Sequence, residues 1–322
     1  VGAESAKSVG FAPAKAILIG EHFVVSGAIA IAIAINLYAK ASAALAPRGS
    51  ISISAPGLMA DGIGLREPRS RGDPFEPLAS MTRAFLERYG IDQGVDIRLS
   101  SEIPLSAGLG SSAAIAVSIL AALSGLFGIR LEREEMFDLA FISERILHGN
   151  PSGIDHATSI YGGAIAYSPS MGFRRLSVDY DITLIIGDTL KRRSTKEQVL
   201  KVQDFLKRNE GIAKEAFERI REISEMAISC LEKGDMRRLG ALMNENQALL
   251  SKVGASSREL DRLIEVAREA GAFGAKLTGA GGGGCMIAIG PQDALDGIEE
   301  SIRRAGGIPY RVRMDKVGCR VR

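Results

Sequence analysis

The chain has almost no surplus of charge, because 40 basic residues face 38 acidic ones and the net charge is only +2. Nucleic acids and anionic membrane surfaces bind proteins through clustered positive charge, so this balance excludes both classes of partner. Cysteine is also scarce, since Cys230, Cys285 and Cys319 lie far apart and lack the spacing of a zinc site or a disulfide framework. Such scattered thiols are typical of the reducing cytoplasm.

Long apolar segments and leader segments are missing as well. The longest apolar run, residues 28–37, is too short to span a bilayer as a helix, and its alternating Ala and Ile predict a strand. The first residues show no charged segment followed by an apolar one and a cleavage site, so we expect no signal peptide and a cytoplasmic location. Asn and Gln occur only five times each, a composition that favours a thermophilic source.

Two signatures of common nucleotide-binding proteins are absent. No G-x-x-x-x-G-K-[ST] segment occurs, which excludes the P-loop NTPases, and the H-R-D and D-F-G signatures of protein kinases are missing. Gly279, Gly281 and Gly284 do match G-x-G-x-x-G, but a strand is predicted after them, where a dinucleotide site requires a helix. The match therefore does not indicate a dinucleotide-binding fold.

The composition, 46% apolar and 24% charged, is that of a globular protein, and 322 residues suffice for one large or two ordinary domains. The first half is predicted to mix strands with helices and to contain one loop or lid. The strands are expected near residues 9–20, 29–45, 50–55, 95–101 and 163–167, the helices near 76–90, 111–127 and 132–148, and the loop between 56 and 77. The composition changes after residues 168–172, so we expect two domains, 1–172 and 173–322.

The second half has a clearer order of elements. We expect a strand at 181–186, helices that begin at capping boxes at Ser194 and Ser256, a helix that ends at Gly234, strands that end at Thr278 and begin at Cys285, a helix near 292–305 and a strand at 309–314. With the helical run counted as one element, the order is β-α-β-β-α-β. That order predicts a ferredoxin-like domain, an antiparallel sheet with helices on one face.

Residues 104–114, Pro-Leu-Ser-Ala-Gly-Leu-Gly-Ser-Ser-Ala-Ala, form a Gly/Ser loop that runs directly into an apolar helix. Glycines let backbone N–H groups turn toward a ligand, and the helix adds its positive dipole end at the same place. The loop therefore predicts a phosphate site, with Ser111 and Ser112 at the helix cap. Taken alone, the same residues also fit an ordinary Ser-capped helix after a turn.

A second glycine-rich segment, residues 276–286, holds four consecutive glycines from Gly281 to Gly284. Such a run is costly to order, because glycine loses more backbone freedom on folding than any other residue. A flexible linker is one interpretation. Both flanks are predicted strands, however, which favours a close approach of the backbone to a ligand or to another loop.

The segment 142–156 carries the strongest candidates for acid–base chemistry. Glu144 and His148 lie four residues apart on one face of a helix, which a Gly-Asn-Pro turn then ends, and Asp155 follows in a Gly-containing loop. One carboxylate that binds a hard cation and a second that accepts a proton would fit this arrangement. A solvated helix face with an Asx turn at Asp155 is the plainer alternative.

Lys15, Glu21 and His22 lie at an apolar strand near the start of the chain, where they could also be ordinary surface residues. Phosphoryl transfer requires a phosphate cradle, oxygen ligands for Mg²⁺, a lysine that offsets charge and a base near the acceptor hydroxyl. The glycine-containing segments together supply residues of all four types, so the sequence predicts a phosphotransferase.

These segments resemble the three motifs of the GHMP kinase superfamily, and within it the chain is most similar to the mevalonate kinases. The resemblance rests on residues 13–22, 104–114, 148–155 and 276–285 and covers about residues 9–290. The stretch His-Gly-Asn-Pro-Ser-Gly-Ile-Asp points to the mevalonate kinases, whereas a galactokinase would carry Glu-His-Thr-Asp in the first motif. The resemblance implies an α+β protein with an N-terminal ribosomal-S5-domain-2-like α/β domain and a C-terminal ferredoxin-like domain.

The resemblance also implies a role for each matching residue. Asp155 would be the catalytic base, with Lys15 close by to keep it ionised and to polarise the acceptor oxygen, and Ser112 and Glu144 would hold Mg²⁺. The phosphate-binding positions would be Pro104, Ser106, Gly108, Leu109, Gly110, Ser111, Ser112 and Ala113. The acceptor side would be lined by Glu21, His22, Ser152 and Thr195. The second-domain loop, with Gly279, Gly281, Gly282 and Gly283, would pack beside the nucleotide loop.

The implied reaction is the ATP-dependent phosphorylation of mevalonate to 5-phosphomevalonate, a step of isoprenoid biosynthesis that uses Mg²⁺. ATP and mevalonate are the expected partners, and a homodimer is an open alternative to a monomer. A sister kinase of phosphomevalonate or homoserine, or a non-catalytic sensor on the same fold, are the other interpretations. The joint presence of Lys15, Ser112, Glu144 and Asp155 favours an enzyme, because a sensor needs neither a base nor a metal ligand.

Overall fold

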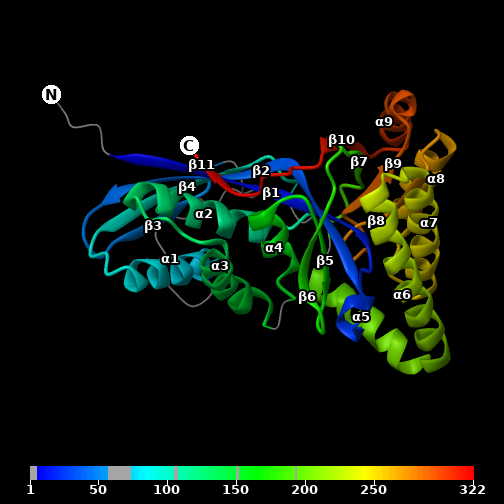
Figure 1. The fold of residues 1–322 in the computed structure, drawn as a ribbon, viewed down its shortest axis with the longest axis horizontal. Coiled ribbons are helices and arrows are strands. Elements are labelled where there is room, and N and C mark those ends of the chain that lie inside the picture. Colours follow the sequence, from blue (N-terminus) through cyan, green and yellow to red (C-terminus); the bar gives the residue numbers. More distant parts are fainter. Residues whose placement is uncertain (1–5, 57–73, 105–107, 150–151, 193) are drawn as a thin grey trace.

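The computed structural model describes residues 6–56, 74–104, 108–149, 152–192 and 194–322, which form two β-sheets and the helices that cover them (Figure 1). The first sheet has the order β11-β1-β2-β4-β3, with β5 joined to β2 and β6 joined to β5. Its strands are β1 (Lys7–Ile19), β2 (Ala30–Ala46), β3 (Ile51–Ser54), β4 (Gly94–Ser101), β5 (Ala164–Ser168), β6 (Gly172–Leu176) and β11 (Arg320–Val321). β3 runs parallel to β4, and the other pairs are antiparallel.

Helices α1 (Glu76–Arg88), α2 (Ser111–Phe127), α3 (Arg133–His148) and α4 (Ile154–Tyr161) cover one face of this sheet (Figure 1). The apolar helix α2 packs against β1 and β2 and against α3. A Cβ at Gly10 of β1 would lie 2.1 Å from the carbonyl oxygen of Ser118, so only glycine lets the helix backbone come this close. The helices predicted near 76–90, 111–127 and 132–148 are confirmed.

The alternating Ala and Ile run forms the first part of β2. Residues 30–35 are buried on both faces, whereas from residue 36 onward buried and more exposed positions largely alternate. The difference arises because α4 packs on the first part of the sheet from one domain, while α6 (Glu210–Lys233) and β10 (Ile308–Arg313) contact β2 from the other. The strand predicted here is confirmed, and it lies where the two halves of the molecule meet.

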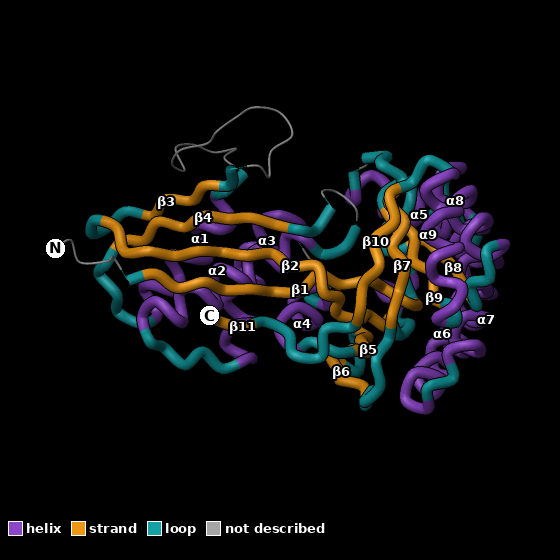
Figure 2. Tube along the Cα trace, turned by 90° about the horizontal axis from the view of Figure 1, so that it is seen from above, coloured by secondary structure: helices purple, strands orange, loops and turns teal. Residues whose placement is uncertain are grey.

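The second sheet has the order β10-β7-β9-β8 with antiparallel neighbours. Its strands are β7 (Thr183–Asp188), β8 (Gly274–Leu277), β9 (Cys285–Ile289) and β10, and its helices are α5 (Thr195–Arg208), α6, α7 (Met236–Lys252), α8 (Arg258–Glu269) and α9 (Leu295–Arg304). This strand order, with α5 to α8 between β7 and β8 and α9 between β9 and β10, confirms the ferredoxin-like prediction. Figure 2 shows β7 and β10 running across the direction of the long strands β1 and β2.

Several local predictions are wrong. The cap of α8 is Ser257 and not Ser256, because the Ser257 hydroxyl accepts the N–H of Leu260 while Ser256 donates to Asp261. The helix predicted from 292 begins as the short 3₁₀ segment η2 (Gln292–Ala294) and becomes α-helical only at α9. The stretch after residue 168 is a β5–β6 hairpin, where a plain junction was expected. A second 3₁₀ segment, η1 (Phe23–Ser26), follows β1 and was not predicted.

The chain crosses from the first sheet to the second between β6 and β7. The predicted domain boundary at residues 172 and 173 stays a prediction, and it falls inside β6, whose partner β5 belongs to the first sheet. After β10 the chain returns to the first sheet, where β11 pairs with β1. Across the described ranges, none of the helices has the length and apolar character needed to cross a membrane.

Candidate active site

An ion pair between Lys15 and Asp155 lies at the centre of the candidate site. Lys15 projects from the middle of β1 and is 3% exposed, and its Nζ lies 3.1 Å from Oδ1 of Asp155. The same ammonium group donates a hydrogen bond to the carbonyl oxygen of Gly108, also at 3.1 Å. Asp155 lies in the first turn of α4, where a loop was predicted, and its side chain is 27% exposed. A carboxylate held by a buried cation and still open to solvent can accept a proton from a bound hydroxyl group.

The Gly/Ser loop brings the start of α2 against this ion pair. Gly108 and Gly110 have φ angles of +80° and +72°, the left-handed region that glycine favours. A Cβ on Gly110 would lie 2.9 Å from Cγ of Lys15 and 3.5 Å from Oδ2 of Asp155. The backbone of Leu109 fixes the loop to β1, because its carbonyl oxygen accepts the N–H of Lys15 at 2.9 Å.

The first turn of α2 therefore faces the site with its backbone N–H groups. Gly110 is the N-cap residue and no side chain caps the helix, so the prediction that Ser111 and Ser112 act as caps is wrong. They are instead the first two helical residues, where N–H groups have no carbonyl partner within the helix. These N–H groups, the dipole of the 17-residue helix and the adjacent Lys15 could together bind a phosphate group. Pro104 and Ala113 are described, whereas Ser106 lies outside the described residues.

Glu144 of α3 supplies a second carboxyl group next to the first. It is 7% exposed, and its Oε2 accepts no hydrogen bond from the described residues and lies 3.7 Å from Nε2 of the buried His156. The pKa of Glu144 is raised from its usual 4.5 to about 7, chiefly by burial and also by the charge of Asp155, while Lys15 opposes both. Glu144 therefore interacts electrostatically with both members of the central ion pair.

A divalent cation fits this corner of the site. An ion bound to Glu144 would compensate a buried carboxylate oxygen that no described group hydrogen-bonds, and Ser112 could add a hydroxyl oxygen. Among the described residues, no group of three or more His, Cys, Asp or Glu side chains could hold a metal. The remaining ligands would therefore be phosphate and water oxygens, as is usual for Mg²⁺. The side chain of His148 lies outside the described part of the chain.

Four contacts join the end of β1 and the turn after it to β8, to the loop that follows β8 and to α7 in the second domain. The N–H of Ile17 donates to Thr278 at 2.8 Å, and the N–H of Gly20 donates to Asn246 at 3.3 Å. Glu21 forms a buried ion pair with Lys276, and Nε2 of His22 lies 2.9 Å from the carbonyl oxygen of Ala280. Only the two glycine-rich segments were predicted to meet, so the part played by Lys276 and Asn246 was missed. A lysine in an apolar strand was the available signal for the first.

The four residues predicted for the acceptor side differ in their surroundings. Glu21 is 2% exposed and paired with Lys276, so the expectation that it lines the acceptor side is not supported by its position. His22 is half-buried and has a φ angle of +61°, unusual for a residue other than glycine, and it faces the second-domain loop. Ser152 precedes α4, where its hydroxyl lies 3.4 Å from the N–H of Ile154, and Thr195 begins α5.

The second-domain loop packs tightly against its own domain. A Cβ at Gly281 would lie 1.9 Å from the carbonyl oxygen of Ala255, and one at Gly282 would lie 2.7 Å from Oε1 of Gln198 in α5. A Cβ at Gly283 would lie 2.6 Å from the carbonyl oxygen of Lys191. Gly279 also has a positive φ angle, +78°. The loop was expected to pack beside the nucleotide loop, but these close neighbours belong to the second domain. From the first domain, His22 contacts the loop at Ala280.

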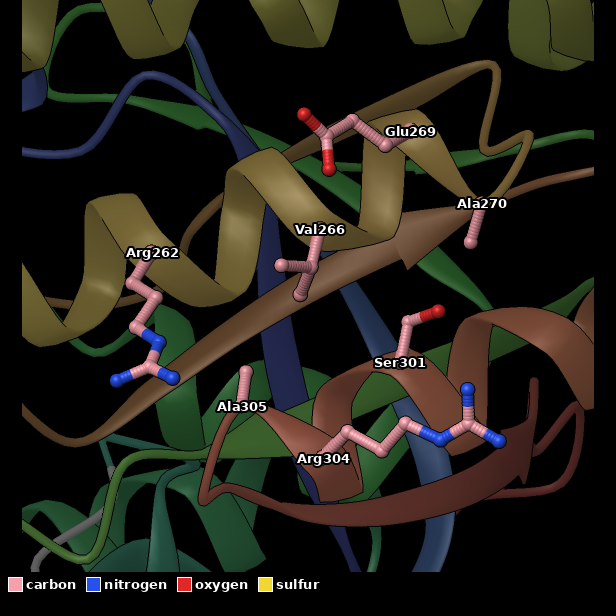
Figure 3. Close-up of a pocket in the computed structure, with 7 residues that line it drawn as sticks. All are labelled: Arg262, Val266, Glu269, Ala270, Ser301, Arg304 and Ala305. Atoms are coloured by element: carbon pink, nitrogen blue, oxygen red, sulfur yellow. The ribbon is translucent and has the colours of Figure 1, made fainter.

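A separate hollow lies between α8 and α9, on the outer side of the second sheet (Figure 3). Its lining residues are Arg262, Val266, Glu269, Ala270, Ser301, Arg304 and Ala305. Lys15 and Asp155 belong to β1 and α4 in the other half of the molecule, so the hollow is not part of the candidate active site.

Comparisons with known proteins agree with this geometry. The family GHMP kinases N terminal domain matches residues 77–163, and the family GHMP kinases C terminal matches residues 227–308. The chain is 38% identical to the mevalonate kinase of Thermococcus gammatolerans over 326 residues, and 36% identical to that of Thermococcus sibiricus over 325 residues. Each alignment covers 96% of this chain and 97% of the relative.

A solved structure with the same architecture is the mevalonate kinase of L. major in complex with R-mevalonate. It superposes on this chain with a TM-score of 0.83 and 27% identity over 98% of both chains. The similarity therefore extends over both sheets and over the contacts between the two domains.

Proposed function

The chain belongs to the GHMP kinase family, and from that premise we propose how its own residues transfer the γ-phosphoryl group of ATP to the 5-hydroxyl group of mevalonate. The full-length similarity to mevalonate kinases identifies the activity as that of a mevalonate kinase. From the geometry of the site we infer which residues bind the substrates, which orient them and which transfer the proton.

The observation that carries the assignment is the Lys15–Asp155 pair, with Nζ and Oδ1 3.1 Å apart directly in front of α2. Asp155 accepts the proton of the attacking hydroxyl group, and Lys15 stabilises the negative charge that develops on the same oxygen. Gly110 lets the start of α2 come close to both Lys15 and Asp155. The acceptor hydroxyl group, bound at the ion pair, and the phosphates, bound at the helix, therefore lie next to each other. Positioning of this kind supplies most of the rate enhancement in phosphoryl transfer.

The start of α2 binds the phosphates through the backbone N–H groups of Ser111, Ser112 and Ala113. Ser112 and Glu144 would hold Mg²⁺, which when bound offsets the charge of the β- and γ-phosphates. The buried Oε2 of Glu144, to which none of the described residues donates a hydrogen bond, supports this role. His22, Ser152 and Thr195 are assigned to the acceptor side, and the loop that contains Gly279 closes the site from the second domain.

Mevalonate carries one carboxylate and no phosphate, so its site needs only modest positive charge. A phosphomevalonate site would need additional Lys or Arg groups for a second dianion. Near the second-domain loop, Lys191 is already paired with Glu259 at 2.7 Å, and Arg193 lies outside the described residues. The free thiols Cys230, Cys285 and Cys319 support the cytoplasmic location.

The test is a coupled assay of ADP release with mevalonate, phosphomevalonate and homoserine at one ATP concentration. We expect kcat/KM for mevalonate to exceed the other two values by at least about 10²-fold, because a site with matched polar groups rejects acceptors that leave them unpaired. A preference for phosphomevalonate would assign the chain to the sister kinase. Absence of ADP release with every acceptor would favour a sensor.

A further inference from the structure

The ion pair between Glu21 and Lys276 is the only pair among the described residues in which both side chains are at most 1% exposed. Glu21 follows β1 in the first domain, and Lys276 lies within β8 of the second. Lys276 also donates to the carbonyl oxygen of Leu277 at 2.6 Å, whereas Oε2 of Glu21 accepts no hydrogen bond from the described residues. The pair thus joins the two domains inside the protein.

Such a pair is a poor source of stability. Burial raises the pKa of Glu21 and lowers the pKa of Lys276, because removing either charge from water costs free energy that their attraction only partly returns. Replacing both partners by neutral groups of similar size is often harmless to stability, whereas removing one leaves a buried charge without compensation. The arrangement therefore needs another explanation, and fixing one segment against another is the best-attested use of buried charge.

The segment that Glu21 fixes is conformationally unusual on both sides. Gly20 has a φ angle of +96°, and a Cβ there would lie 2.4 Å from the carbonyl oxygen of Ile29. His22 has a φ angle of +61°, a conformation that is unfavourable for a residue with a Cβ. Strained backbone of this kind persists only when its surroundings hold it. Asn246 holds Gly20, Ala280 holds the ring of His22, and the ion pair holds the residue between them.

We propose that Lys276 is a positioning residue for phosphoryl transfer, whose ion pair with Glu21 fixes the turn of residues 20–22 against the second-domain loop. Through this turn Lys276 sets where His22 lies relative to the Lys15–Asp155 pair. β1, which leads into this turn, carries Lys15 five residues before Gly20. A displaced turn should therefore disturb the binding of the acceptor more than the binding of the phosphates. This inference rests on the proposed function of the site.

The decisive variant is the neutral pair Glu21→Gln with Lys276→Met, compared with wild type and with each single substitution. We expect both single variants to lower the melting temperature and the double variant to recover most of that loss. We expect the double variant nevertheless to show a KM for mevalonate at least about 10-fold higher and a kcat at least about 10-fold lower, with KM for ATP within twofold. A stable double variant with wild-type kinetics would overturn the proposal, because the pair would then act on stability alone.

Two further variants keep the test decisive if the double variant does not fold. Glu21→Asp keeps the charge but shortens the side chain by one methylene group, and we expect at least about a fivefold rise in KM for mevalonate with KM for ATP unchanged. A KM for mevalonate within twofold of wild type would overturn the proposal. Lys252→Met, which breaks the exposed pair with Glu215, is the matched control and should leave all three constants unchanged. If wild type phosphorylates a different acceptor, the proposed function fails and the same variants are judged with that acceptor.

Discussion

At the scale of single residues, three buried ionisable groups near the start of α2 have their charges compensated in different ways. Lys15 is paired with Asp155, and Glu21 is paired with Lys276. Glu144 lies 3.7 Å from His156 and accepts no hydrogen bond at Oε2 from the described residues. Among the carboxylates of this site, that of Asp155 combines a cation partner with partial exposure, so it is the group suited to exchange a proton with a substrate.

Asp155→Asn keeps the shape of the side chain and removes the proton acceptor. We expect kcat to fall by roughly 10²–10⁴-fold while ATP binds almost normally, since general bases contribute on this scale. Steady-state kinetics and ATP titration of the variant provide the measurement. Turnover above about half of the wild-type rate would show that another group takes the proton.

The raised pKa of Glu144, about 7 against its usual 4.5, makes the stability of the metal-free protein depend on pH. The folded protein disfavours the ionised carboxylate, so the destabilisation is small below pH 4.5, grows as pH rises to 7 and is complete above it. Glu144→Gln removes this effect. Chemical unfolding with a chelator present should show the variant more stable by about 3 kcal/mol at pH 8 and by well under about 1 kcal/mol at pH 4.5.

The same variant tests the metal role by its response to Mg²⁺ and ATP. Together they should stabilise wild type more than Glu144→Gln at pH 8, because only the carboxylate gains a compensating charge. The Mg²⁺ concentration for half-maximal activity should also rise in the variant. Equal stabilisation of the two proteins together with overlapping Mg²⁺ curves would remove Glu144 from the set of metal ligands.

Sequence reasoning reached Lys15, Asp155 and Glu144 because each lies in a segment whose residue pattern carries chemical meaning by itself. It did not assign a role to Lys276. The partner of Lys276 is 255 residues away, and no local pattern shows which lysine of an apolar strand meets which glutamate. His156 is similar, since its burial beside Glu144 depends on how α3 packs against α4.

At the scale of elements, α2 begins and ends with a glycine in the left-handed conformation, Gly110 at +72° and Gly128 at +64°. A Cβ on Gly110 would press on Lys15 at 2.9 Å, whereas a Cβ on Gly128 would meet nothing within 4 Å. Gly110→Ala and Gly128→Ala thus share the backbone cost and differ in their contact with the site.

We expect each alanine variant to lose about 1–2 kcal/mol of unfolding free energy from the positive φ angle. Gly110→Ala should also lower kcat at least about 10-fold, because displacing Lys15 by a few tenths of an ångström disturbs the acceptor geometry. Gly128→Ala should keep wild-type kinetics. Equal activity of the two variants would show that the start of α2 tolerates movement against Lys15.

The sequence predicted α2 well and missed α4 and β6, for reasons that lie in their length and surroundings. α2 is 17 residues long and follows a clear Gly/Ser turn. α4 has eight residues and begins directly after Gly153, so its pattern is too short to outweigh the turn signals before it. Much of β6 is exposed, with Arg174 and Arg175 on the surface, and it is a strand only because β5 lies beside it.

At the scale of the whole molecule, Asp315 anchors the return of the chain to the first sheet. Its carboxylate is 4% exposed, accepts Tyr38 at 2.7 Å and Arg320 at 3.0 Å, and also accepts the backbone N–H groups of Val317 and Gly318. Burial alone would raise the pKa of Asp315, but these hydrogen bonds together hold it below its usual value. The ionised form therefore stabilises the fold.

Asp315→Asn should cost about 1.5–3 kcal/mol at pH 7, the range for hydrogen bonds to a charged group. Because the folded pKa is lowered, this stabilisation is present above the usual pKa near 3.8 and is lost as pH falls through the folded value, so the difference between variant and wild type should shrink in acid. Denaturant unfolding at pH 7 and below pH 3.8 measures it. Asp181→Asn, at the exposed pair with Lys316, is the control and should change stability little.

The two-sheet plan and the strand order of the second sheet followed from the order of predicted elements along the chain. The return of β11 to β1 did not, because β11 has two residues and no pattern that distinguishes it from a loop. The contacts between the domains could not be predicted either, since they are single contacts such as that of Ile17 with Thr278 and not a repeated motif.

The position of β11 also determines when the first sheet is completed during synthesis. β11 leaves the ribosome about 140 residues after the end of β6, and at roughly 5–20 residues per second this is a delay on the order of 10 s. Until then the backbone of β1 at Gly10 and Phe11 has no partner on that side and is open to pairing with another nascent chain. Among the described strands with a neighbour on both sides, β1, which carries Lys15, is thus the last to gain its second neighbour, so early chaperone binding is most useful there.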